Sequence, residues 1–228
     1  MPLARYKDMC IDAVEPERLG RFWAAALRLK HEPRGDEPTP LTGPTKQHTL
    51  WVNPVPEPKA FKHRIHIDIN ASSVEEIAAL GATVLDDRSF PWTVMADPED
   101  GEFCVFVREG VITQRLYEVG VDCSEPHEIA AWWAEVLGGR LVDDARGYSY
   151  VDEIPGTPFD SMDFVPVPEP KAGKNRIHID VATGDVEALV AAGATVVRPP
   201  HDTIDWHVLA DPEGNEFCAF VRTDVSDH

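Results

Sequence analysis

The chain contains two copies of one sequence pattern, and this duplication limits its possible folds more than any other feature. HRIHIDI at residues 63–69 recurs as NRIHIDV at residues 175–181, 112 positions later. The segment around Trp23 recurs 110 positions later around Trp133, and ADPEDGEFC recurs 114 positions later as ADPEGNEFC. Blocks that keep their order while their spacing grows slightly indicate a duplicated unit. A unit this long is a whole domain, because solenoid units span about 20–50 residues.

The boundary between the two copies falls after the segment FCVFVREG and before RLYEVGVD. We therefore expect domain 1 at residues 1–112 and domain 2 at residues 113–228. A chain of 228 residues is long enough for one large domain or two small ones, and the duplication favours two. We expect them to pack as an internal pseudo-dimer, in a chain that is a monomer or forms a homodimer.

Each copy is predicted to run strand, helix and three strands, twice over. In the second copy, Ser124 is expected to cap a helix that has Pro126 in its first turn and ends at Gly138. The Trp and Leu residues of this helix recur at helical spacing and are expected in the core. Residues 32–47 of the first copy are rich in Pro and Gly, so we expect a looser segment there, which is either a lid or idle.

The repeated heptapeptide alternates charged and aliphatic residues, as a strand with one apolar face does. Arg64, His66 and Asp68 would share one face, and Ile65 and Ile67 would lie on the other. The polar face is either a functional site or a solvated sheet surface. In a site, His66 would bind a metal or accept a proton. In the alternative, it would simply bond to a neighbour across the sheet.

Composition excludes several partner classes. The chain has 21 basic against 40 acidic residues and a net charge of −19, which disfavours nucleic acid and anionic membrane surfaces. No apolar run approaches the ~20 residues of a membrane span. The N-terminal MPLARYKDMC lacks the layout of a signal peptide, and the four cysteines form no CxxC pair. We therefore expect a cytoplasmic protein with reduced thiols and a small-molecule partner.

Motifs at both ends of each copy resemble those of one superfamily. FWAAAL and WWAEVLG near the start, with DPEGNEFC near the end, resemble the vicinal oxygen chelate (VOC) superfamily, which includes glyoxalase I and bleomycin-resistance proteins. RIHIDV, AAGATVV and WHVLADPEGNEFCAF are similar to bacterial tandem glyoxalase-like domains, and the resemblance covers nearly the whole chain. It implies an α+β fold of two tandem VOC (glyoxalase-like) domains, each with paired βαβββ modules whose curled mixed sheets form a cup.

The resemblance also implies positions for metal ligands that project into the cup. A divalent zinc, nickel, iron or manganese ion would use nitrogen and oxygen donors there. The usual set of two His and two Glu is not present in either copy, and a strand Cys is commonly a buried apolar residue. A ligand on the strand before the Pro-rich turn has no clear counterpart: the first copy offers Trp51 and Asn53, and the second offers Asp163. The expected donors are His178, Glu118 and Cys218 together, and His66, Asp8 and Cys104 together.

Other repeated residues are candidates for binding a substrate. Arg64 and Arg176 would hold an anionic group, or alternatively form ion pairs with Asp68 and Asp180 or with acids on neighbouring segments. Aromatic side chains before the ADPE segments would form walls of the cup, or alternatively part of the core. These aromatic residues are Trp92 and Trp206.

Two functions remain open from the sequence. The first is an enzyme of the lyase or isomerase type, acting on a small oxygenated or electrophilic metabolite. The second is a non-catalytic cup that binds or sequesters a small molecule, which the missing Glu ligand favours along with a metal-free enzyme. In the enzyme, the predicted catalytic residues are His178, Glu118, Asp180, His66 and Asp68.

Overall fold

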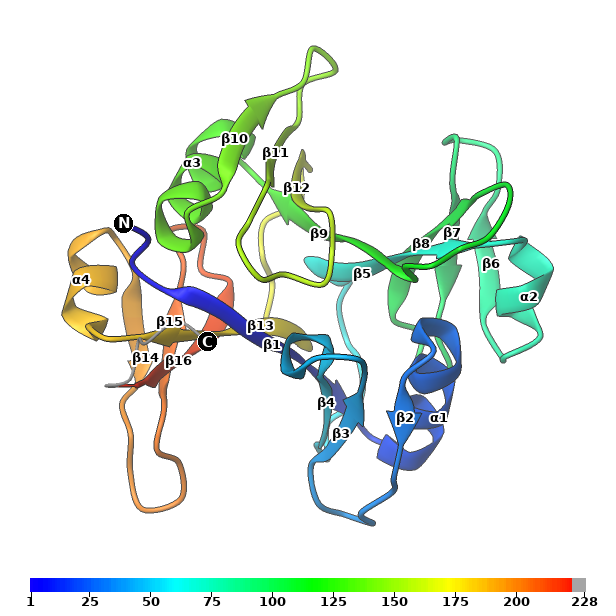
Figure 1. Cartoon of the computed structure of the whole chain (residues 1–228), viewed down its shortest axis with the longest axis horizontal. Helices are drawn as coiled ribbons and strands as arrows, with labels where there is room; N and C mark the ends of the chain where they lie inside the picture. Colours follow the sequence, from blue (N-terminus) through cyan, green and yellow to red (C-terminus); the bar gives the residue numbers. More distant parts are fainter. Residues whose placement is uncertain (223–228) are drawn as a thin grey trace.

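The computed structural model describes residues 1–222 and consists of four consecutive βαβββ modules (Figure 1). Each sequence copy contributes two modules. The first copy forms β1 (Arg5–Ala13), α1 (Pro16–Leu27), β2 (Lys30–His31), β3 (Thr39–Thr42), η1 (Lys46–His48), β4 (Leu50–Pro54), β5 (Ile65–Ala71), α2 (Val74–Ala78), β6 (Thr83–Asp86), β7 (Thr93–Ala96) and β8 (Glu102–Val107). The second forms β9 (Leu116–Cys123), α3 (Pro126–Leu137), β10 (Arg140–Asp143), β11 (Ser149–Asp152), β12 (Ser161–Pro166), β13 (Ile177–Thr183), α4 (Val186–Ala191), β14 (Thr195–Arg198), β15 (His207–Ala210) and β16 (Glu216–Val221).

The modules pair across the two copies. Within residues 1–222, sheet A has the order β14-β15-β16-β13-β1-β4-β3-β2 and sheet B the order β10-β11-β12-β9-β5-β8-β7-β6. Each sheet is mixed, because antiparallel central pairs (β1 with β13, β5 with β9) are flanked by parallel pairs such as β1 with β4 and β5 with β8. The predicted α+β architecture of paired modules is confirmed, and each sheet takes one module from each copy.

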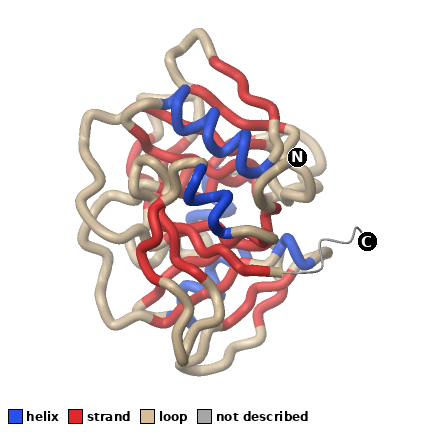
Figure 2. The backbone as a smooth tube through the Cα atoms, turned by 90° about the vertical axis from the view of Figure 1, so that its left-hand side faces the viewer, coloured by secondary structure: helices blue, strands red, loops and turns tan. Residues whose placement is uncertain are grey.

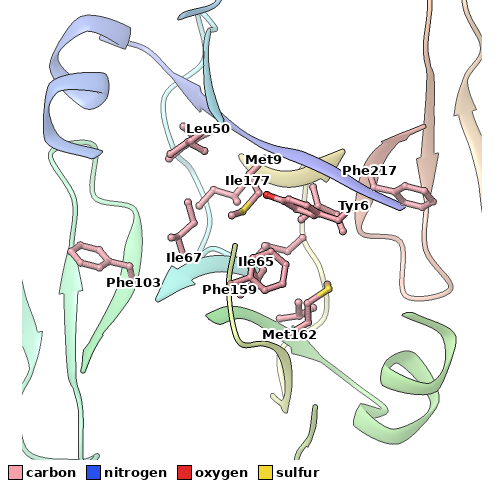
Figure 3. Close-up of a cluster of buried hydrophobic side chains, with 14 of the residues drawn as sticks. Tyr6, Met9, Leu50, Ile65, Ile67, Phe103, Phe159, Met162, Ile177 and Phe217 are labelled. Carbon is pink, nitrogen blue, oxygen red and sulfur yellow. The ribbon is translucent and has the colours of Figure 1, made fainter. Parts of the chain in front are cut away.

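The core lies between the apolar faces of the two sheets. Figure 3 shows Met9 and Ile177 of sheet A beside Ile65 and Ile67 of sheet B, all of them buried. Full burial of one such aliphatic side chain contributes about 2 kcal/mol. The alternation predicted for the heptapeptide is therefore present, with its isoleucines in the core.

Short helices lie against the strands (Figure 2), and the two longest place tryptophans in the core, as expected. Trp23 of α1 packs edge-to-face on Phe103, and Trp133 of α3 packs in the same way on Phe217. None of the helices in residues 1–222 combines the length and apolarity that a membrane span requires.

Helix α3 ends at Gly138 in the left-handed conformation, as expected, but its start differs from the prediction. Glu125 is the N-cap residue and makes no side-chain capping bond. Instead, the backbone N–H groups of Ser124 and Glu125 donate to the carboxylate of Glu213 in the β15–β16 turn. This distant carboxylate therefore fixes the two residues that lead into the helix, and no side chain caps its first turn.

The segment 32–47 is also more regular than expected. Thr39–Thr42 forms β3, which pairs with both β2 and β4, and Lys46–His48 forms a short 3₁₀ helix. Leu41 and Thr39 are buried on the inner face. Tertiary pairing with β4 therefore forms a strand where local composition is unfavourable.

Candidate functional site

The polar faces of the two sheets each carry a cluster of histidine, acidic and cysteine side chains. We call the cluster on sheet A site A, comprising Asp8, Cys10, His178, Asp180 and Cys218. We call the cluster on sheet B site B, comprising His66, Asp68, Cys104, Glu118 and Asp163. Both form where a central strand of one sequence copy pairs with a central strand of the other.

Strand register arranges site B in two rows across the sheet. In the first row, Gly120 lies opposite His66 on one side and Asp163 on the other. In the second row, Glu118 lies opposite Asp68. Successive residues on a strand alternate in direction, so these rows, two residues apart, project from the same face.

His66 is held in one orientation by its neighbours. Its Nδ1 lies 2.6 Å from Oδ1 of Asp68, which also accepts the backbone N–H of Cys104 at 2.8 Å. The imidazole lies over Gly120, where an added Cβ would come within 2.1 Å of Cε1. Burial lowers the pKa of His66, but the Asp68 carboxylate outweighs this and raises it above the ordinary value. Because Asp68 occupies Nδ1, Nε2 is the ring atom that could bind a ligand.

The acidic side chains of site B destabilise one another's charge. Burial, then the charges of Asp163 and Asp68, raise the pKa of Glu118 to about 9. Burial raises the pKa of Asp163 to about 6 despite a hydrogen bond from Ser161. Such shifts mark a place where a positive charge would be strongly favoured.

Site A differs in having a lysine beside its acids, although burial, then Asp180, still raise the pKa of Asp8 to about 6. Lys7 Nζ lies 2.7 Å from Asp8 and 3.6 Å from Asp180, and Trp51 Nε1 donates to Asp8 at 3.1 Å. Although burial lowers the pKa of His178, neighbours including Cys10 and Asp180 raise it well above the ordinary value. Site A therefore already contains cationic groups next to its carboxylates.

Thiols flank the histidine of site A. Cys218 Sγ lies 3.4 Å from His178 Nε2, and Cys10 Sγ lies 3.7 Å from the Asp180 carboxylate. Burial raises the pKa of Cys10 to about 12, so this thiol keeps its proton. The sequence analysis did not identify Cys10 as a site residue. Cys10 lies two residues after Asp8 on a predicted strand, so strand alternation places both side chains on one face and could have identified it.

Stacked aromatic rings border both sites. Trp92 lies between Phe90 at 5.1 Å and Phe106 at 5.3 Å, and Phe106 continues to Tyr117 at 4.8 Å. Phe106 is two residues from Cys104 on β8, so this row approaches site B. In sheet A, Trp206 stacks on Phe220 at 5.3 Å.

The predicted metal ligands are grouped differently in the structure from the grouping that we expected. We expected Glu118 beside His178 and Asp8 beside His66, within single copies. Because β5 pairs with β9, Glu118 instead lies opposite Asp68 in site B. Because β1 pairs with β13, Asp8 lies opposite Asp180 in site A. The predicted grouping by sequence copy was therefore wrong, while Cys104 remains beside Asp68 and Cys218 beside His178.

The two predicted substrate-binding arginines lie outside both clusters. Arg64 donates to the backbone oxygen of Glu169 at 2.6 Å, and Arg176 donates to that of Glu57 at 2.7 Å. Arg176 also forms an ion pair with Glu99 at 2.9 Å. Of the alternatives, ion pairs with nearby acids are confirmed, since Arg64 also lies 4.0 Å from Glu213. Pairing with Asp68 and Asp180 is wrong, because the segments preceding β5 and β13 direct these side chains toward the opposite copy.

A divalent metal, which the resemblance implies, has candidate donor groups in both sites. Within residues 1–222, donor atoms lie within 4.8 Å of one another for His66, Asp68 and Cys104 in site B, and for Cys10, His178 and Asp180 in site A. Site B offers His66 Nε2 and the carboxyl oxygens of Glu118 and Asp163, and hard divalent ions prefer nitrogen and oxygen donors. In site A, Lys7 beside Asp8 and Asp180 opposes a second cation. Burial, then Asp68, raise the pKa of the Cys104 thiol, which disfavours it as a ligand.

Comparisons with known proteins agree with this architecture. The chain resembles glyoxalase I from Zea mays with 16% sequence identity and a TM-score of 0.71, covering 97% of this chain and 93% of that chain. It also resembles a putative dioxygenase from Bacillus subtilis with 12% identity and a TM-score of 0.67, covering 97% of this chain and 86% of that chain. At these identities, the likeness concerns the fold alone. A search of curated proteins gave no match.

A family model described as glyoxalase-like domain matches residues 8–106 and again residues 118–220. The two matches correspond to the two sequence copies and together cover most of the chain. The chain therefore belongs to the glyoxalase-like domain family, with two copies of the domain in tandem.

Proposed function

We propose that site B is an active site that binds a divalent metal ion and a small oxygenated organic molecule. The reaction would be of the lyase or isomerase type. The observation that carries this proposal is the group of three carboxyl side chains, Asp68, Glu118 and Asp163, on one polar sheet face. The pKa values of Glu118 and Asp163 are raised although Arg108 and Arg146 act to lower them, and a bound cation would relieve these shifts.

Each residue of site B has a distinct role in this proposal. His66, Glu118 and Asp163 would hold the metal, with Asp68 orienting His66 through Nδ1. The two carboxyl groups would move toward His66 on binding, because the site B donor atoms that already lie within 4.8 Å of one another are those of His66, Asp68 and Cys104. When bound, the metal would polarise a carbonyl or hydroxyl oxygen of the ligand. The carboxyl group of Glu118 can accept or deliver a proton beside that oxygen, because its pKa of about 9 falls as positive charge approaches.

The aromatic row beside site B would bind the organic part of the molecule. Trp92 and Phe106 present stacked ring faces, and such faces favour flat or aliphatic groups. Site A would then be a second binding surface without metal, because Lys7 already places a positive charge beside its acids.

The test is elemental analysis of the whole chain purified without chelators. We expect one metal ion per chain, lost in His66→Ala and in Glu118→Gln. The matched controls are His178→Ala and Asp8→Asn, which change the corresponding residues of site A and should retain the metal. Metal that survives both site B substitutions, or that is lost only in the site A controls, would contradict the proposal.

The second candidate function is non-catalytic binding of a small flat molecule. The stacked rings beside both sites favour it, because they occur whether or not the neighbouring cluster fits a metal. Absence of metal, combined with a thermal shift caused by planar aromatic compounds and abolished by Trp92→Ala, would select this function over the enzyme.

A further inference from the structure

A cavity of about 250 Å³ lies where the two sequence copies meet, outside both sites. Its walls come from connector 1 (residues 55–64) and connector 2 (residues 167–176). Connector 1 carries the chain from β4 of sheet A to β5 of sheet B, and connector 2 returns it from β12 to β13. Figure 1 shows them as the cyan and yellow links between these strands.

The charged lining of this cavity is mainly cationic, in a chain whose net charge is −19. Each connector supplies one lysine and one arginine at equivalent positions of the repeat. Cationic side chains outnumber acidic ones by four to two, the six being Lys62, Arg64, Lys174, Arg176, Asp12 and Glu57.

The two guanidinium groups are fixed in place by reciprocal bonds. Arg64 of connector 1 donates to the backbone of connector 2 at Glu169, and Arg176 of connector 2 donates to the backbone of connector 1 at Glu57. Each connector is thus bound to the other by an arginine. The Nε of Arg64 is buried and has no hydrogen-bond partner among the described residues. Each guanidinium group also has an acidic neighbour, Glu213 at 4.0 Å from Arg64 and Glu99 at 2.9 Å from Arg176.

The two lysines are paired but remain exposed. Lys62 pairs with Asp122 and Lys174 pairs with Asp12, but each lysine side chain is 58% exposed. The aspartate of each pair is buried, so each ammonium group stays near its carboxylate while its exposed side remains open to a ligand. Fixed arginines flanked by these lysines line the cavity with donors for an anion.

We propose that this cavity binds a compact anion with two negatively charged groups, such as a dicarboxylate or pyrophosphate. The cations come in two equivalent pairs, one per connector, and so match a ligand with a charge at each end. The bound anion would tie together the two segments that cross between the sheets. Because Arg64 lies two residues before His66, the ligand would also stabilise the start of the strand that carries site B.

The test is titration of the whole chain with sodium pyrophosphate and with sodium malonate, followed by calorimetry and thermal shift. Sodium chloride at equal ionic strength and sodium acetate are the reference salts. We expect saturable binding of at least one of these two anions. Acetate, which has a single charged group, should bind at least about tenfold more weakly. No saturable binding at millimolar concentrations, or equal binding of acetate, would overturn the proposal.

Substitutions locate the binding in the cavity. Lys62→Gln with Lys174→Gln should weaken dianion binding about tenfold or more, and each single substitution should weaken it in part. The matched control is Lys30→Gln with Lys46→Gln, which removes the same charge from two exposed lysines outside the cavity. Circular dichroism verifies that the variants are folded. Equal loss in the control pair would show a general charge effect and refute the cavity as the site.

Discussion

At the scale of single residues, the two sites differ at equivalent positions that determine their charge. Gly120 in site B corresponds to Cys10 in site A, since each lies opposite the histidine of the neighbouring strand. Asp163 of site B corresponds to Trp51 of site A. Asp163 lies opposite Gly120, and Trp51 lies opposite Cys10, in each case on the neighbouring strand that does not carry the histidine. Where site B has the acid Asp163 and the glycine Gly120, site A therefore has a tryptophan and a cysteine. Lys7 adds a positive charge to site A.

Gly120→Ala should displace the imidazole of His66. An added Cβ would come within 2.1 Å of Cε1, and overpacking of this kind costs about 1–3 kcal/mol. We expect a lower free energy of unfolding, measured by urea denaturation, and weaker metal binding. In a His66→Ala background, the same substitution should cost little, because the clashing ring is gone. Equal costs in both backgrounds would contradict the predicted contact.

Glu118→Gln should change how stability depends on pH. A carboxyl group whose pKa rises from 4.5 to about 9 on folding binds more protons in the folded chain. The free energy of unfolding then falls as pH rises through this window. Gln mimics the protonated acid, so the metal-free variant should lose less stability toward the alkaline end than the wild type. Urea denaturation at several pH values after chelator treatment tests this, with the exposed Glu75→Gln as control.

At the scale of secondary-structure elements, the ADPE turns connect modules as well as strands. Asp97 Oδ1 accepts the backbone N–H groups of Glu99 and Gly101, and its Oδ2 accepts the indole N–H of Trp23 from α1. Asp211 makes the equivalent bonds to its own turn and to Trp133 of α3. Each turn thus shapes a hairpin and holds a helix of another module.

Asp97→Ala should therefore destabilise the chain by about 3 kcal/mol, since three donors lose a buried acceptor. Asp87→Ala, at an exposed position, should cost less than about 0.5 kcal/mol. Urea denaturation followed by tryptophan fluorescence measures both. A cost for Asp97→Ala no larger than that of the control would show that the turn does not need its carboxylate.

The sequence predicted the elements well, and the pairing between them less well. Alternation in the repeated heptapeptide correctly separates His66 and Asp68 from the isoleucines, because strand periodicity is a local property. The partner of β5 is not a local property. Strands β1 and β9 have equivalent sequences, so no pattern distinguishes pairing within one copy from pairing between copies. For this reason Glu118 was grouped with His178 rather than with His66.

At the scale of the whole molecule, neither sequence copy contains a complete sheet. Strand β1 has its antiparallel partner β13 in the second copy, and β5 has its partner β9 there. Sheets A and B therefore each require both copies, although the family model matches the copies one at a time. The division of the chain into two sequence copies therefore does not coincide with the division of the fold into two sheets.

Polypeptides 1–112 and 113–228, produced separately, should not fold as monomers. Each would expose the central edges of two half-sheets, and such edges pair with other strands. We expect folded material only in species containing two polypeptides, recovered when the halves are mixed or when a half self-associates. Light scattering after size exclusion gives the mass, and circular dichroism gives the strand content. A folded monomeric half would contradict the prediction.

The interleaving of the copies also has a genetic consequence. In a homodimer of a single repeat, twofold symmetry would make both clusters identical, and every codon change would alter both at once. A fused gene removes that restriction, because codons 10 and 120 mutate independently, as do codons 51 and 163. One cluster can then keep a set of acids while the other accumulates an indole, a thiol and a lysine, within a single translation product.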